Sequence, residues 1–116
     1  METPDADRGH VVLGPVGELD MATVGTFDTV LDAVLARPGL VEIVVDLAEV
    51  TFVDSTGVAA LLRGAAEAVG RGASLRIVHP QPVVARVLRI TAVGSLLGLP
   101  DGGVEGTWPG GPGRRR

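Results

Sequence analysis

The sequence predicts an α/β domain, because short strands and amphipathic helices alternate along the chain. A nearly continuous, β-branched apolar run over residues 40–47 is typical of a strand covered on both faces of a parallel sheet, and we expect it to be the central strand. Apolar residues at helical spacing follow over residues 55–69. The chain has 116 residues, 46% of them hydrophobic, which is enough for one core but hardly for two.

The first part of the chain is predicted to form a strand and a helix. Apolar residues alternate and then cluster over residues 10–16, as in a strand, and residues 17–20 are predicted to be the turn after it. A helix is expected over residues 21–36, with Asp20 or Thr23 as its cap and an Arg-Pro-Gly sequence after its end. Its inward residues are predicted to be Val24, Phe27, Leu31, Val34 and Leu35.

The second part is predicted to contain two helices with a strand between them. A polar turn follows the central strand and leads into the helix over residues 55–69. Residues 74–80 are predicted to form a strand, and residues 82–94 a helix with Pro82 in its first turn and Gly94 past its end. The inward residues of the two helices are predicted to be Val58, Leu61, Leu62, Ala65 and Val69, and Val84, Val87, Leu88 and Thr91.

One folded domain with two tails is expected. Residues 1–8 are short, acidic and predicted to be flexible, and the domain is expected to span residues 9–106. Beyond residue 100 glycine and proline dominate, which disfavours ordered structure apart from a short edge strand around Val104. Residues 107–116 are therefore predicted to be a mobile tail.

The charge balance argues against nucleic acid as a partner. The formal net charge is −4, and three of the ten basic residues are the arginines at 114–116. Residues 1–113 therefore carry 14 acidic residues against 7 arginines, or −7. A surface this acidic repels phosphate backbones.

Several other classes of protein are disfavoured. Without cysteine, and with two isolated histidines, His10 and His79, a metal site or a disulfide framework is not expected. No apolar stretch reaches the roughly 18–20 residues of a membrane span and the N-terminus is acidic, so a cytoplasmic protein is expected. No Gly-x-Ser-x-Gly or phosphate-binding Gly-x-x-x-x-Gly-Lys motif is present, so we expect neither an enzyme nor a cofactor.

The stretch TFVDSTGVAALL, residues 51–62, places a serine where the second helix is predicted to begin. Asp54, Ser55 or Thr56 there can serve as an N-cap, which contributes about 1 kcal/mol. Alternatively, Ser55 is a phosphorylation site, because a helix N-terminus favours an added phosphoryl group of roughly −1.5 to −2 charges. Thr56, one position away, is a second possible acceptor.

The residues around this serine are predicted to form a partner surface. In an alternating α/β topology the turns that carry Asp20 and Asp54 lie at the same sheet edge, near Ser55. Each aspartate can equally be a cap or turn residue. Small residues, namely Gly57, Ala60 and Gly64, would let a kinase or partner approach closely, and tight packing of the helix on the sheet is the alternative explanation for them.

The segments VGELDMATV, VEIVVDLAEVTFVDSTGVAALL and LRIVHPQPVVARVLRITAVGSLL together resemble the STAS domains of bacterial anti-sigma factor antagonists, also called anti-anti-sigma factors. The resemblance covers about residues 11–97, and its most specific parts are the turns ending in Asp20 and beginning at Asp54. It implies a mixed, mostly parallel sheet of about four to five strands with helices packed over it. Relatives usually have a further strand before the position of residue 10, where this chain has only a short acidic segment. They also have a full final helix, where this chain is rich in glycine and proline.

The resemblance also implies a function in transcription regulation by partner switching. The unphosphorylated domain would bind an anti-sigma factor, itself a serine kinase, and so free a sigma factor. The kinase would phosphorylate Ser55, and a serine phosphatase would reset the switch. STAS domains also serve as packing modules in anion transporters and lipid-trafficking complexes, and this alternative stays open, as does an anionic small ligand at the helix N-terminus.

Overall fold

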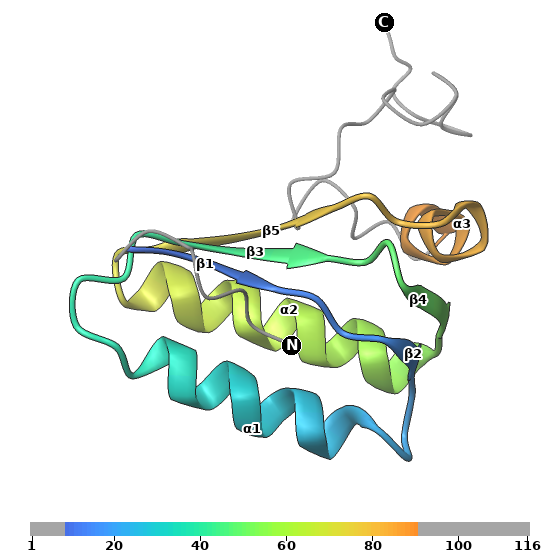
Figure 1. The fold of residues 1–116 in the computed structure, drawn as a ribbon, viewed down its shortest axis with the longest axis horizontal. Helices are drawn as coiled ribbons and strands as arrows, with labels where there is room; N and C mark the ends of the chain where they lie inside the picture. The colour runs from blue at the N-terminus through green and yellow to red at the C-terminus, as the bar shows by residue number, and fades with distance from the viewer. Residues whose placement is uncertain (1–8, 91–116) are drawn as a thin grey trace, which may run out of the picture.

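The computed structural model describes residues 9–90, which form five strands and three helices (Figure 1). In chain order the elements are β1 (His10–Leu13), β2 (Gly17–Leu19), α1 (Val24–Leu35), β3 (Glu42–Asp46), β4 (Val50–Val53), α2 (Ser55–Gly70), β5 (Ser74–Val78) and α3 (Pro82–Ile90). The predicted features at Thr91, Gly94 and Val104, and the segments 1–8 and 107–116, lie outside the described residues.

The main sheet is three-stranded and parallel, with β3 between β1 and β5, so the predicted central strand is confirmed. α1 and α2 lie side by side against one face of it (Figure 1). Val44, whose side chain alternates with the buried Ile43 and Val45, is half-buried. Within the described residues the helices α1 and α2 thus cover one face only, and the expected cover on both faces of β3 is not met.

The second sheet is a parallel pair of β2 and β4. The turns predicted from the sequence at both places are wrong, because strands of three and four residues are too short to show a recognisable apolar pattern. Pro15 separates β1 from β2, since proline has no N–H for the ladder. Beyond this break the Gly17 N–H donates to the carbonyl oxygen of Glu49 at 2.9 Å. All strand pairs of residues 9–90 are parallel, so the antiparallel member of a mixed sheet is not among them.

α2 packs through its small residues. Gly57, Ala60 and Gly64 are buried, whereas Val69, which was predicted to face inward, is 68% exposed. A Cβ at residue 64 would lie 2.7 Å from Cδ2 of Leu31 in α1, which shows how closely the two helices approach. The helix residues that are buried as predicted are Phe27, Leu31, Val34, Leu35, Val58, Leu61, Val84 and Leu88.

Arg63 joins the outer sides of α1 and α2. Its Nη2 donates to Asp28 Oδ1 at 2.8 Å, and its Nη1 donates to Glu67 Oε2 at 2.6 Å and to Asp32 Oδ1 at 3.3 Å. The hydrogen bonds with Asp28 and then Glu67 raise the pKa of Arg63 above its ordinary value, so the guanidinium stays charged. Because the Arg63 side chain is 37% exposed, each pair contributes only about 0–1 kcal/mol.

The position of α2 on β2 can be tested at Gly57. A Cβ there would collide with the backbone carbonyl of Leu19, and a backbone atom cannot move aside as a side-chain end can. We therefore expect Gly57→Ala to lower the free energy of unfolding by about 1–3 kcal/mol in urea denaturation. Gly25→Ala is the control, because nothing lies within 4 Å of its added Cβ, and its stability should be unchanged or slightly higher. Parent-like stability of Gly57→Ala would contradict this packing.

Candidate site at the head of helix α2

Ser55 is the first residue of α2 and is exposed. The N-cap is its neighbour Asp54, whose backbone is extended and whose Oδ1 accepts a hydrogen bond from the Gly57 N–H at 3.0 Å. Among the described residues none hydrogen-bonds to the Ser55 hydroxyl. Of the three capping residues that the sequence left open, the structure therefore selects Asp54, and the Ser55 hydroxyl takes no part in the cap.

The turn after β2 lies directly beside this helix start. Leu19 is in register with Val53 across the β2–β4 pair. The Asp54 N–H donates to the carbonyl oxygen of Leu19 at 3.3 Å, and Asp54 Oδ2 accepts from the Met21 N–H at 3.4 Å. The structure thus brings together the two acidic turns that sequence reasoning places at one sheet edge.

The Asp20 carboxylate shapes its own turn. Its Oδ1 accepts from the N–H groups of Ala22 at 3.0 Å and Thr23 at 3.2 Å. The Thr23 hydroxyl accepts from the Asp20 N–H at 3.0 Å and donates to the carbonyl oxygen of Glu18 at 2.7 Å. Of the two expected caps for α1, Asp20 provides the side-chain oxygen, and Thr23 is the N-cap residue by position without a capping bond of its own.

The other predicted site residues divide into two groups. Thr56 is half-buried beside Ser55. Gly57, Ala60 and Gly64 are buried, so their assignment to a surface that a partner approaches is corrected: Gly57 lies against β2 and Gly64 against Leu31. The close approach that these small residues permit is between elements of this chain, which is the packing explanation that the sequence left open.

Three exposed apolar side chains in or beside β2 and β4 were missed by sequence reasoning. Val16 is 76% exposed before β2, Met21 is 77% exposed after it, and Phe52 in β4 is 46% exposed. Phe52 is in register with Glu18 across the β2–β4 pair, and both are exposed. The alternation of side chains in a strand decides which of these residues face solvent, and it could not be applied because turns were predicted at β2 and β4.

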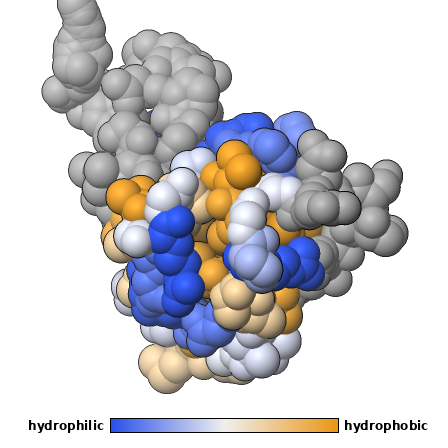
Figure 2. All heavy atoms as spheres, turned by 90° about the vertical axis from the view of Figure 1, so that its left-hand side faces the viewer, coloured by the Kyte–Doolittle hydropathy of each residue, from blue (hydrophilic) through white to orange (hydrophobic). Residues whose placement is uncertain are grey.

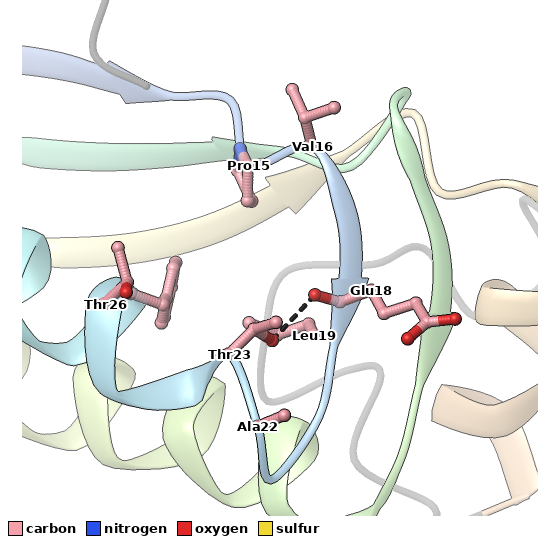
Figure 3. A pocket seen from close by; sticks show the side chains of 8 residues that line it. Pro15, Val16, Glu18, Leu19, Ala22, Thr23 and Thr26 are labelled. Carbon is pink, nitrogen blue, oxygen red and sulfur yellow. Dashed lines mark hydrogen bonds between the residues drawn. The ribbon is translucent and has the colours of Figure 1, made fainter.

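A hollow of about 260 Å³ lies between β2 and the first turns of α1 (Figure 3). The buried residues among those that line it are Pro15, Leu19 and Phe27, and the exposed threonines at positions 23 and 26 stand on the side of α1. The Glu18 side chain points away from the hollow toward β4 in Figure 3. The surface beside the Asp20 turn is therefore hollowed, with buried apolar residues and exposed threonines in its lining.

Four acidic residues lie along β2 and β4: Glu49 is beside the start of β2, Glu18 is within it, and Asp20 and Asp54 are in the turns that follow the two strands. Within residues 9–90 no arginine or histidine forms an ion pair with any of them, whereas Asp28, Asp32, Glu67, Glu42 and Asp46 each have such a partner. This end of the molecule is consequently the more negative one.

The helices within residues 9–90 are all too short or too polar to cross a bilayer.

The fold and this arrangement define a small α/β domain whose candidate site is a pair of acidic turns with an exposed hydroxyl at a helix head. A family model described as "Mlab, STAS domain" matches residues 3–98. The chain therefore belongs to the STAS domain family.

Solved structures of similar fold come from regulators and from a transporter family. The anti-sigma factor antagonist SpoIIAA in its unphosphorylated form gives a TM-score of 0.64 at 21% identity, over 78% of this chain and 81% of that chain. The Bacillus cell fate determinant SpoIIAA in the phosphorylated form gives 0.66 at 21% identity, over 83% and 86%. A sulfate transporter family protein from Wolinella succinogenes gives 0.65 at 20% identity, over 78% and 74%. No curated protein sequence matches the chain significantly.

The assignment of the cap to Asp54 can be tested by stability measurements. Asp54→Ala removes the oxygen that accepts from the Gly57 N–H, so we expect it to lower the free energy of unfolding by about 0.5–2 kcal/mol. Asp54→Asn keeps an acceptor and should lose less. Ser55→Ala removes a hydroxyl without a partner in the described part of the chain and should change stability by less than about 0.5 kcal/mol. A loss at Ser55→Ala equal to that at Asp54→Ala would make the serine part of the cap.

Proposed function

We propose that this chain is an anti-sigma factor antagonist that is controlled by phosphorylation of Ser55. Its unphosphorylated form binds an anti-sigma factor that is also a serine kinase, and this frees the sigma factor. The kinase phosphorylates Ser55 and thereby ends binding, and a serine phosphatase restores the unmodified form. The chain is then a binder and a substrate in bacterial transcription regulation in the cytoplasm, and it needs neither catalysis nor a cofactor of its own.

The observation that carries this proposal is the exposed Ser55 hydroxyl, which is spared from capping by Asp54. A capping serine would lose its hydrogen bond on modification, and α2 would be weakened. Ser55 has no such bond within the described residues, so its modification leaves the helix start intact. The similarity to SpoIIAA, an anti-sigma factor antagonist with a phosphorylated form, supports the same assignment.

The electrostatics explain how one phosphoryl group would end binding. It adds roughly −1.5 to −2 charges to a turn that already carries Asp20 and Asp54. The α2 N-terminus tolerates this charge, because the helix dipole favours anions there. A partner that closes over the turn meets the added charge and bulk, and each 1.4 kcal/mol lost weakens binding about tenfold. Asp20, Asp54 and Thr56 remain the proposed contact residues around Ser55.

The proposal can be tested by capture of partners from an extract of the source cells. Parent, Ser55→Ala and Ser55→Asp chains serve as bait, with Thr56→Ala as the matched control for the neighbouring hydroxyl. We expect a kinase-like protein to be retained by Ser55→Ala and lost with Ser55→Asp, because only the latter carries the charge. Intact mass and fragmentation should locate a phosphoryl group on Ser55 of the parent, and Thr56→Ala should behave as the parent does. Equal capture by Ser55→Ala and Ser55→Asp would refute the charge mechanism.

A second candidate is a STAS packing module in a transporter or lipid-trafficking complex. Two observations favour it, namely the "Mlab" description of the matching family model and the similar fold of a sulfate transporter family protein. In that case all baits would retain the same transporter or ATPase subunit, and Ser55 would be unmodified.

A further inference from the structure

The hollow beside β2 is of a size that suits one large side chain. Its volume of about 260 Å³ is below the roughly 300–1,000 Å³ of sites for drug-sized ligands. Its floor consists of Pro15, Leu19 and Phe27, all buried, and the exposed Thr26 at its edge offers a hydroxyl oxygen. An apolar ring with one polar N–H fits this chemistry, because a buried indole needs an acceptor for its N–H.

Acidic residues follow the course of β2 beside the hollow. Glu49 lies beside the first residue of β2, where its carbonyl oxygen accepts from Gly17, Glu18 lies within the strand, and Asp20 follows its end. These are members of the acidic group that has no cationic partner within residues 9–90. Because the Glu18 side chain points across β2 toward β4, a chain that places a ring in the hollow and continues over β2 would meet Glu18, with Glu49 before and Asp20 after the strand. Such a chain therefore needs positive charge.

The opposite end of the molecule differs in charge. There the C-terminal ends of α1 and α2 lead into Arg37 and Arg71, both exposed. Figure 2 views this end and shows hydrophobic patches between hydrophilic ones. The end that carries β2 and β4 is the one where the acids Glu18, Asp20 and Glu49 form no ion pair within residues 9–90, so a basic segment is attracted there.

The chain itself contains a segment of the matching chemistry. Trp108 is its only tryptophan, and the arginines at 114–116 are three of its ten basic residues. Between the end of α3 and Trp108 lie residues 91–107, and these 17 positions span at most about 60 Å. α3 packs against β4, which pairs with β2, so the hollow is well within this reach.

We propose that residues 107–116 dock onto this hollow in the same molecule. The Trp108 ring occupies the hollow, and the three arginines lie over Glu18, Asp20 and Glu49. The consequence for regulation rests on the proposed function: the docked segment covers the Asp20 turn and competes with the partner. Phosphorylation of Ser55 adds negative charge nearby and so strengthens docking of the arginines. In the phosphorylated form, which does not bind the partner, the docked segment then also covers the Asp20 turn.

Docking can be measured on the purified full chain by the fluorescence of its single tryptophan. We compare the parent with a variant that carries Arg114→Gln, Arg115→Gln and Arg116→Gln together. In the variant we expect a shift of the emission maximum to longer wavelength and easier quenching by acrylamide, because the indole is released into water. Glu18→Gln should shift the emission in the same direction. Asp32→Asn is the control and should not shift it: this variant makes an equal change of charge on α1, and Arg63 keeps its pairs with Asp28 and Glu67. At 1 M salt, where the Debye length falls to about 3 Å, the parent should approach the triple variant.

The site of docking is located by amide chemical shifts of the same full-length chains. Between the parent and the triple variant, shifts should change at Val16, Ala22 and Thr26, around the hollow. Identical tryptophan emission in both chains, or shift changes confined to another face, would overturn the proposal. An emission difference that disappears on dilution would also overturn it, since the segment would then dock between copies. No partner is needed for these measurements, so their failure and the failure of the proposed function are distinguishable.

Discussion

The parallel pairing of β2 with β4 is the constraint on which the site depends. It places the turn after β2 beside the start of α2, where the carbonyl oxygen of Leu19 accepts from the Asp54 N–H. Gly57 then lies so close to Leu19 that any side chain would collide with the β2 backbone. The helix head is thereby fixed between a strand and a turn, and the exposed hydroxyl of Ser55 is presented on a rigid support.

Asp54 stabilises the start of α2 as its cap, whereas the neighbouring Ser55 carries the exposed hydroxyl. Asp54 satisfies an N–H of the first turn of α2 and also accepts from the Met21 N–H of the neighbouring turn. The serine next to it is exposed, and its hydroxyl forms no hydrogen bond in the described part of the chain. A group that no element of the fold needs can be modified at little cost to folding, and the helix dipole favours a negative charge at that place.

The molecule is also polarised along its strands. The acids around β2 and the start of α2 lack cationic partners among residues 9–90, while Asp28, Asp32 and Glu67 on the outer sides of the two helices pair with Arg63. Exposed apolar side chains, among them Met21 and Phe52, lie at the same negative end. Apolar surface bordered by acids suits a basic and partly apolar binding segment, whether from another protein or from the same chain.

Much of this protein was determined by the sequence alone. The α/β class, the central strand, the three helices and most of their buried residues follow from local apolar periodicity, and the residues around Asp20 and Ser55 were marked by their turn chemistry. Only the tertiary structure decided that residues 17–19 and 50–53 are strands, that Asp54 is the cap, and that Gly57, Ala60 and Gly64 face inward. The reason is physical: these features are set by hydrogen bonds and packing between residues distant in the chain, such as Leu19 with Val53, which no local pattern encodes.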